Sequence, residues 1–366
     1  MLFVRGIVRL QPMTVTATRL LPQLVRVADY HLHTARYAAS VVSDGAAIYV
    51  VGGRDKTDHD IGAIERFDLR THAVTEISAA IARRAFTSAV MFGNRIYIFG
   101  GEISGDGDPR DRVEIVDLAD DTVKPGGLMP GQLRRISGVL VNGRVFFIGG
   151  EAPSLHAIKK KLDRIILLPV FEPATAKWFR GKASPLSLET CAVSMGRMII
   201  VAGGSNKAAE YASVECYDTK ADTWFQLPPL CVPCSDNSAA ILGRTEYLFG
   251  RRGSEGDVVA YDPASGYSCE LSQTGFAPAV FTAAVTCGNS IYVIGGETAL
   301  NGGETQEFGG EQAGDEEGIP IDDIQVFSIV QKEVTEGQVR VGQPTVREYL
   351  DSLPAGTAEG PHAPAH

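Results

Sequence analysis

A glycine pair that follows a short apolar run occurs six times along the 366-residue chain, and this repeat limits the fold more than any other feature. The six segments are IYVVGG, IYIFGG, VFFIGG, IIVAGG, EYLFGR and IYVIGG, and their first glycines are Gly52, Gly100, Gly149, Gly203, Gly250 and Gly295. These glycines are 48, 49, 54, 47 and 45 residues apart. A period of about 40 to 50 residues is typical of the blades of a β-propeller.

Two further positions repeat in register with the first glycine. Seven residues before it stand Gly45, Gly93, Asn142, Gly196, Gly243 and Gly288. Twelve residues before it stand Ser40, Ser88, Ser137, Cys191, Ser238 and Ala283. Glycine and asparagine suit the positive φ of a tight hairpin turn, and small residues suit strands that crowd around a central axis. The repeat therefore predicts a hairpin of two inner strands in each copy.

A second block follows each glycine pair. An apolar residue precedes an acid in Phe67-Asp68, Val116-Asp117, Phe171-Glu172, Tyr217-Asp218 and Tyr261-Asp262, and the sixth copy reads Phe327-Ser328. Seven residues after the apolar position stand Val74, Val123, Trp178, Trp224, Ser268 and Val334. This pattern indicates a third strand, a turn and a fourth strand, so each repeat supplies one four-stranded blade.

These residues resemble the kelch repeat over about residues 36–341, with departures in copy 5 at Arg251 and Ser268. The resemblance implies an all-β fold, a six-bladed kelch-type β-propeller with four antiparallel strands per blade. The expected blades span about residues 36–82, 83–131, 132–186, 187–233, 234–278 and 279–341.

The sequence does not decide which end of the chain closes the ring. Residues 326–336 align with the third and fourth strands of the first repeat, so blade 6 is expected to supply its own fourth strand. Residues 14–27 also have a strand pattern, and either clasp onto the last blade or belong to a disposable leader. Residues 1–35 are expected to form an N-terminal arm, and residues 342–366 a flexible tail.

Composition narrows the class of protein. The net charge of −10 argues against nonspecific binding to nucleic acid or to anionic membranes. Six cysteines without regular spacing suggest reduced thiols, and a cytoplasmic protein is expected. The alternative is a mitochondrial protein, because no acid precedes Asp29 in the arginine-bearing N-terminus. No metal-binding spacing, cofactor motif or catalytic motif is found, so no metal, cofactor or catalytic residue is assigned.

Arginines near the start of the first strand are the main candidate binding residues. Arg36 and Arg84 stand sixteen residues before the first glycine of their copies, whereas Arg135, Glu189 and Asp236 stand fourteen before theirs. The resemblance implies that Arg36 and Arg84 bind acidic peptide motifs, as arginines at this entrance do in kelch domains of the ubiquitin-adaptor type. Arg135 is two positions off that register, so the implication does not extend to it. The alternative is that the first two arginines brace neighbouring blades through Glu65 or Glu114.

Two long connections between the second and third strands supply further candidates on the same face. The connection in blade 3 is basic and contains Lys159, Lys160 and Lys161, and the connection in blade 6 is acidic and contains Glu316 and Glu317. Long loops on a rigid scaffold are common places for binding residues.

The sequence thus predicts a monomeric, non-enzymatic scaffold that binds a protein partner through one loop face of the propeller. The partner is expected to present an acidic segment. The alternative function is binding or isomerising a small molecule of the sugar-acid type at the channel mouth, with a ring of arginines and carboxylates.

Overall fold

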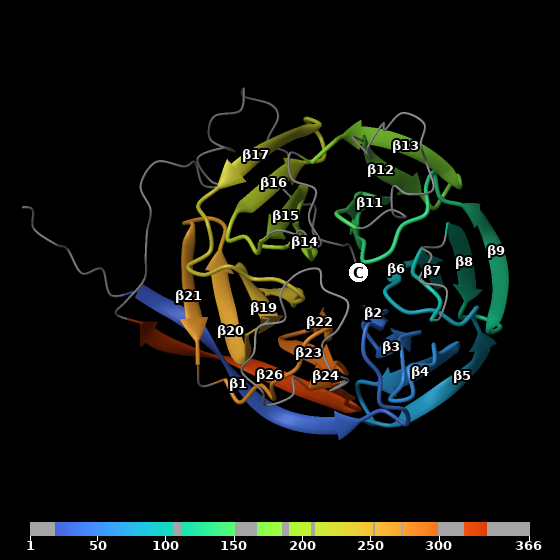
Figure 1. The fold of residues 1–366 in the computed structure, drawn as a ribbon, viewed down its shortest axis with the longest axis horizontal. Coiled ribbons are helices and arrows are strands. Elements are labelled where there is room, and N and C mark those ends of the chain that lie inside the picture. The colour runs from blue at the N-terminus through green and yellow to red at the C-terminus, as the bar shows by residue number, and fades with distance from the viewer. Residues whose placement is uncertain are drawn as a thin grey trace, which may run out of the picture.

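A computed structural model describes residues 19–104, 111–150, 167–184, 190–205, 209–251, 253–272, 274–298 and 318–334. In these residues the chain forms six four-stranded antiparallel sheets arranged around a central axis, so the molecule is a disc (Figure 1). The described segments contain no helix that could cross a membrane. The all-β, six-bladed propeller predicted from the repeats is confirmed.

The blades follow one another along the chain, and each runs from the axis to the rim. Blade 1 has β2 (Ser40–Ser43), β3 (Ala47–Val51), β4 (Ala63–Asp68) and β5 (Val74–Ala80); blade 2 has β6 (Ser88–Phe92), β7 (Arg95–Phe99), β8 (Arg112–Asp117) and β9 (Thr122–Leu128). Blade 3 has β10 (Ser137–Val141), β11 (Arg144–Ile148), β12 (Leu167–Glu172) and β13 (Lys177–Lys182); blade 4 has β14 (Ala192–Met195), β15 (Met198–Ala202), β16 (Val214–Asp218) and β17 (Thr223–Leu227). Blade 5 has β18 (Ser238–Leu242), β19 (Thr245–Arg251), β20 (Ser254–Asp262) and β21 (Tyr267–Leu271).

Blade 6 is assembled from both ends of the described chain. It consists of β22 (Ala283–Cys287), β23 (Ser290–Ile294), β26 (Asp323–Val334) and, outermost, β1 (Arg19–His31). A short pair, β24 (Glu297–Thr298) and β25 (Ile319–Pro320), lies between β23 and β26 in sequence. The N-terminal strand therefore clasps the last blade and closes the ring.

The expectation that blade 6 supplies its own fourth strand is wrong. Residues 326–334 continue straight through β26 instead of turning back. Blades 1, 2, 4 and 5 turn at an aspartate whose carboxylate accepts backbone N–H groups, as Asp68 does from Arg70 and Thr71. In blade 3 the Glu172 carboxylate accepts the Thr175 hydroxyl instead. Ser328 stands at this position in blade 6, followed by the β-branched Ile329, so the sequence favours a continued strand.

The glycine pairs lie where one blade meets the next. Gly52 has a φ of 64°, and a Cβ added there would lie 2.6 Å from the carbonyl oxygen of Arg84 in blade 2. The neighbouring Gly53 N–H donates to the same Arg84 oxygen at 3.1 Å. The pair is therefore needed both for its backbone angles and for this close approach between blades.

The small residues of the innermost strands join the blades around the axis. Ser40 contacts Thr87 across blades 1 and 2 at 3.1 Å, and the Gly138 N–H of blade 3 donates to Ser88 of blade 2 at 2.9 Å. The same layer continues with Ser137 to Ala192, Asn237 to Cys191 and Ser238 to Thr282. Most hydroxyl groups of this layer thus stabilise the ring.

Candidate functional site at the channel mouth

A ring of left-handed residues forms the mouth of the central channel. Ala38, Phe86, Arg135, Asp236 and Phe281 have φ values between 52° and 54°, and each stands fourteen residues before the first glycine of its copy. Their backbones hydrogen bond from blade to blade: Phe281 N–H to Asp236, Ala38 N–H to Phe281, Phe86 N–H to Ala38 and Arg135 N–H to Phe86, over 2.9 to 3.3 Å. Non-glycine residues rarely adopt this conformation, so the ring holds these side chains in fixed directions.

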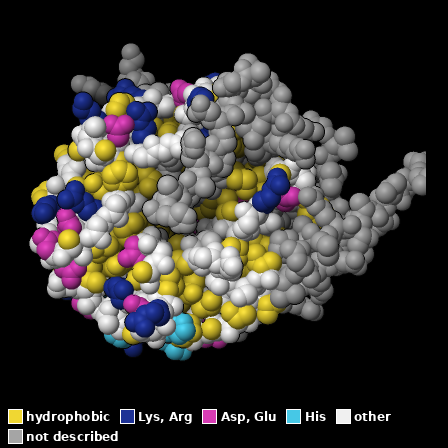
Figure 2. All heavy atoms as spheres, turned by 180° about the vertical axis from the view of Figure 1, so that it is seen from behind, with side chains coloured by type: hydrophobic (Ala, Val, Ile, Leu, Met, Phe, Trp, Pro, Cys, Tyr) yellow, Lys and Arg dark blue, Asp and Glu magenta, His cyan; other side chains and the backbone are white. Residues whose placement is uncertain are grey.

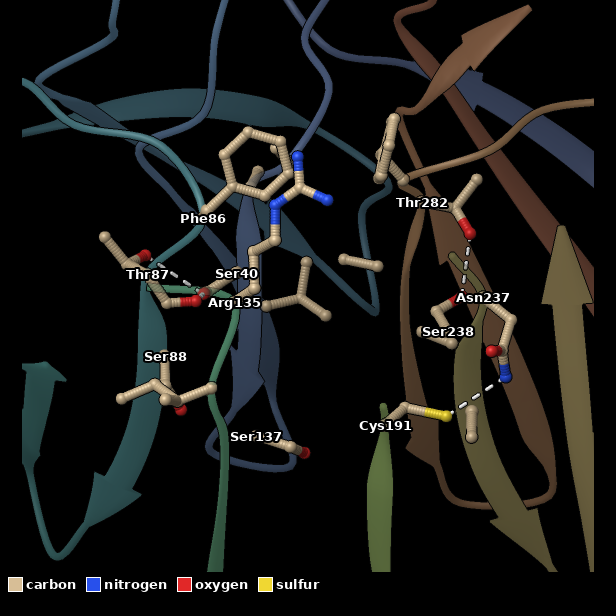
Figure 3. Close-up of a pocket in the computed structure, with 18 of the residues that line it drawn as sticks. Ser40, Phe86, Thr87, Ser88, Arg135, Ser137, Cys191, Asn237, Ser238 and Thr282 are labelled. Carbon is tan, nitrogen blue, oxygen red and sulfur yellow. Dashed lines mark hydrogen bonds between the residues drawn. The ribbon is translucent and has the colours of Figure 1, made fainter. Parts of the chain in front are cut away.

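The side chain of Arg135 reaches across the mouth from blade 3. Its guanidinium carbon lies 4.4 Å from the ring centre of Phe86 in blade 2 and 5.4 Å from that of Phe281 in blade 6. Its Nη1 atom lies 4.0 Å from Oδ1 of Asp236 in blade 5. Figure 3 shows the guanidinium group beside the Phe86 ring, above the opening between the blades. Arg135 is therefore a partly exposed cation close to the axis, held by contacts with three other blades.

Below the mouth the channel forms a cavity of about 290 Å³. Its wall contains small polar residues such as Ser40, Ser88, Ser137 and Thr282, most of them already joined to a neighbouring blade. Asn237 differs, because its Nδ2 donates to Cys191 Sγ at 3.1 Å while its buried Oδ1 has no hydrogen-bond partner in the part of the chain that the structure describes.

A polar network surrounds the mouth on the side of blades 1, 2 and 3. Arg54 of blade 1 bonds Asp60 at 2.9 Å and Glu102 of blade 2 at 3.2 Å, and Glu102 also pairs with Arg134 of blade 3. Tyr37 donates to Asp58 at 3.0 Å, and burial raises the pKa of Tyr37 to about 12, so it stays protonated near neutral pH. The network thus places charged side chains beside the aromatic centre on this side.

Arg36 and Arg84 lie inside the blades rather than at the mouth. Both are buried, and their guanidinium groups pair with Glu65 and Glu114 respectively. Arg36 Nη1 donates to Gly52 O in its own blade at 3.0 Å, while the Arg36 carbonyl accepts from Gly296 of blade 6 at 2.9 Å. Burial lowers the pKa of both arginines, and the paired carboxylates oppose that change. These contacts join neighbouring blades, and a binding role for the two arginines stays a prediction.

The glutamates of these pairs also accept hydrogen bonds from the backbone of the connection that leads into each blade. Glu65 accepts the His33 N–H at 2.7 Å and the Thr34 N–H at 3.2 Å, which follow β1. Glu114 accepts the Ala82 N–H at 3.2 Å, which follows β5. Each Arg–Glu pair thus ties a connection between blades to the third strand of the next blade.

Several predicted residues lie outside the described residues. They are Glu189, Lys159, Lys160, Lys161, Glu316 and Glu317. Among the four predicted binding residues that the structure describes, it brings together Arg135 and Asp236.

Sequence reasoning missed Phe86 and Phe281, the two rings beside Arg135. The signal was present, because both share the register of Arg135 and Asp236, fourteen residues before the first glycine. Comparing that one position across all six repeats would have found them.

The cysteines and His31 are two further groups of side chains that bear on chemistry. All six cysteines are free, and burial raises the pKa of Cys234 to about 12, well above that of a reactive thiolate. His31 lies 3.3 Å from Asp322 and 3.2 Å from Asp323 on the exposed rim of blade 6.

The face seen in Figure 2 carries hydrophobic side chains between scattered charged ones. Basic and acidic side chains lie beside one another there, and no large area of one sign is formed by the residues in colour. The coloured part of this face therefore carries no uniform charge.

Comparison with known proteins agrees with this architecture. The Kelch motif matches residues 35–79, 83–127 and 188–230, within blades 1, 2 and 4. The chain is 26% identical to human Kelch-like protein 34 over 63% of this chain and 38% of that protein. It is 23% identical to Kelch-like protein 35 of Mus musculus over 58% of this chain and 35% of that protein.

The chain spans little more than a third of the length of these curated relatives. The similarity therefore concerns the propeller, and it assigns to this chain no function of the complete relatives. The motif matches, the relatives and the ring of six four-stranded blades together support a kelch-repeat β-propeller.

Proposed function

We propose that the protein is a non-enzymatic interaction module that binds a protein partner at the channel mouth, with Arg135 contacting an acidic segment of that partner. The observation that carries this proposal is the placement of the Arg135 guanidinium at the axis, between Phe86 and Phe281. An arginine whose position is already fixed loses little side-chain entropy on binding, and its planar group suits a carboxylate.

The composition of the mouth supports a protein interface. Aromatic residues and arginine are enriched at the energetic centres of interfaces, and a polar rim commonly surrounds them. Here Tyr37 lies 6.4 Å from Phe86 and 6.3 Å from Phe281, so three rings gather beside Arg135. The Arg54 network provides the polar surroundings.

The test is affinity capture with the immobilised propeller, followed by direct titration of each captured protein. The variants are Arg135→Ala and, as a matched control, Arg144→Ala. Arg144 is half-exposed on β11 and pairs with Glu172, away from the mouth. We expect a captured partner to lose affinity by at least about tenfold with Arg135→Ala, to keep it with Arg144→Ala, and to bind more weakly at high salt. Equal recovery with both variants would refute the proposal.

The arginines first predicted from the sequence need a separate test. Because Arg36 and Arg84 are buried in ion pairs, the double variant Arg36→Ala, Arg84→Ala is expected to lose stability. Partner binding should therefore be measured only where circular dichroism shows a folded protein. If the folded double variant loses affinity as Arg135→Ala does, these residues also contribute to binding.

A second candidate function is binding of a small anionic molecule of the sugar-acid type. The cavity of about 290 Å³ and the unpartnered Asn237 Oδ1 favour it, because a ligand hydroxyl could donate to this oxygen. Thermal shift with sialic acid and glucuronic acid separates the two functions. A shift that Asn237→Ala removes would support the small-molecule function, and no shift would reject it for these sugars.

A further inference from the structure

Asp236 lies opposite Arg135 in the mouth, although the two residues come from blades 5 and 3. Their side chains approach to 4.0 Å, and the Asp236 side chain is 10% exposed against 29% for Arg135. The pair therefore places a nearly buried carboxylate beside the cation that a partner is proposed to contact.

The backbones of the two residues are held in place at the mouth. Arg135 and Asp236 both have left-handed φ values, and both belong to the hydrogen-bonded ring of the mouth. A charge-assisted hydrogen bond between arginine and a carboxylate is about 2.7 to 2.9 Å long. At 4.0 Å the two charges attract each other, but the gain is smaller than a partner carboxylate would make in direct contact.

The carboxylate of Asp236 also repels an incoming acidic group. Two like charges near one cation oppose each other, and this effect grows where little water separates them. Asp236 thus weakens the binding of an acidic segment in two ways. It offsets part of the positive charge of Arg135, and it repels the segment's carboxylates directly.

Resting on the function proposed above, we propose that Asp236 is an internal competitor for Arg135, which weakens the binding of an acidic partner segment and selects partners able to displace it. The carboxylate is a specificity-determining group of the mouth and makes no favourable contact with the partner. A weakly acidic segment fails to replace it, whereas a segment that brings a carboxylate into direct contact with Arg135 succeeds.

The substitution Asp236→Asn tests this inference with little structural change. Asparagine has nearly the same shape and adopts the left-handed conformation more readily than most residues. Glu172→Gln is the matched control, because it removes the same charge from the far end of β12, where Glu172 pairs with Arg144. The probes are a capped octapeptide of glutamate and a capped octapeptide of glutamine, titrated by calorimetry or fluorescence anisotropy at low and high salt.

We expect Asp236→Asn to tighten glutamate-peptide binding by about two- to fivefold at low salt, the range of a partly exposed charge interaction. Glu172→Gln should leave the affinity unchanged, and the glutamine peptide should not respond to any variant. When Asp236→Asn is added to Arg135→Ala, the increase in glutamate-peptide affinity should be smaller than when it is made alone, because the effect of Asp236 depends partly on Arg135.

The outcomes separate the inference from the function on which it rests. Binding that depends on Arg135 but is unchanged or weakened by Asp236→Asn would overturn the competitor role alone. No glutamate-peptide binding by any variant would overturn the acidic-segment function, and the inference with it. Binding by Asp236→Asn where the unmodified protein shows none would support both.

Discussion

Blades 1 and 2 differ from blade 3 in where an arginine stands before the first strand. Arg36 and Arg84 precede the first glycine by sixteen residues, and Arg135 precedes it by fourteen. The first two are buried in ion pairs within their blades, whereas Arg135 projects over the channel. A shift of two positions thus separates a structural arginine from an accessible one.

The reason is the backbone at the entrance to each blade. The backbone carbonyl of the residue sixteen before the glycine accepts a hydrogen bond from the glycine pair of the preceding blade. The Arg84 carbonyl, for example, accepts the Gly53 N–H. The residue fourteen before is left-handed and belongs to the ring at the axis. Residue type alone therefore does not identify a binding arginine in this fold, and register does.

The same comparison applies to buried carboxylates. Glu65 and Glu114 have arginine partners, but Glu246 of blade 5 is fully buried and neither of its carboxylate oxygens has a hydrogen-bond partner in the described residues. The equivalent positions of the other blades, four before the first glycine, hold Ile48, Ile96, Val145, Ile199 and Ile291. Glu246 thus occupies a position that elsewhere belongs to the apolar core.

The largest effect is expected from breaking the buried pair of blade 1. Arg36→Ala would leave the Glu65 carboxylate buried without its cation, and we expect a loss of about 3 to 5 kcal/mol in the free energy of unfolding, measured in urea. The double variant Arg36→Ala, Glu65→Gln should recover part of this loss, because glutamine is neutral and still accepts an N–H. A loss below about 1 kcal/mol for Arg36→Ala would contradict a structural role.

A smaller, pH-dependent effect is expected at Glu246. Burial raises the pKa of Glu246 to about 8, from an ordinary value of 4.5. Since the folded protein holds this proton more tightly than the unfolded chain, the contribution of Glu246 becomes less favourable as the pH rises from about 4.5 to 8 and then levels off. Glu246→Ile should therefore stabilise the protein by roughly 3 kcal/mol near pH 8 and by less near pH 5.

Urea unfolding of Glu246→Ile and the unmodified protein across this pH range checks the prediction. Glu172→Gln serves as the control for a removed surface carboxylate. A stability difference that does not change with pH would mean that folding does not raise the pKa of Glu246.

Arg135→Ala should change stability much less than Arg36→Ala. The variant removes cation–π contacts with two rings, worth about 0.5 to 1 kcal/mol at exposed sites, and a partly exposed charge pair. We expect a loss of about 1 kcal/mol in urea unfolding together with the loss of partner binding described above. If Arg135→Ala destabilised the protein as strongly as Arg36→Ala, the distinction between the two registers would fail.

Local backbone requirements explain why the blades could be predicted from the sequence. Gly45, Asn142 and the glycine pairs occupy positive-φ positions that recur at fixed spacing. The strand order at the closure could not be decided, because residues 14–27 and 326–336 both have strand patterns and only pairing in space selects β1 as the outer strand.

The mouth was harder to predict because its defining residues share a backbone conformation and no residue type. Alanine, phenylalanine, arginine and aspartate all adopt the left-handed conformation there. The tertiary hydrogen-bond ring imposes it against the preference of a residue such as Phe86, so local propensity gives no warning.

The smallest effect is expected at Arg144, the arginine used above as a control. It pairs with Glu172 at 3.0 Å and stacks on Phe179, but its side chain is 48% exposed. Water screens such a pair and the side chain loses entropy in forming it, so many surface pairs contribute nothing measurable. Arg144→Ala should therefore lower the free energy of unfolding by at most about 0.5 kcal/mol, less than Arg135→Ala, because only one exposed ring contact and a screened ion pair are lost. A clear loss would show that pairing with a carboxylate, rather than burial, sets the value of an arginine in this propeller, and the contrast between blades would need another cause.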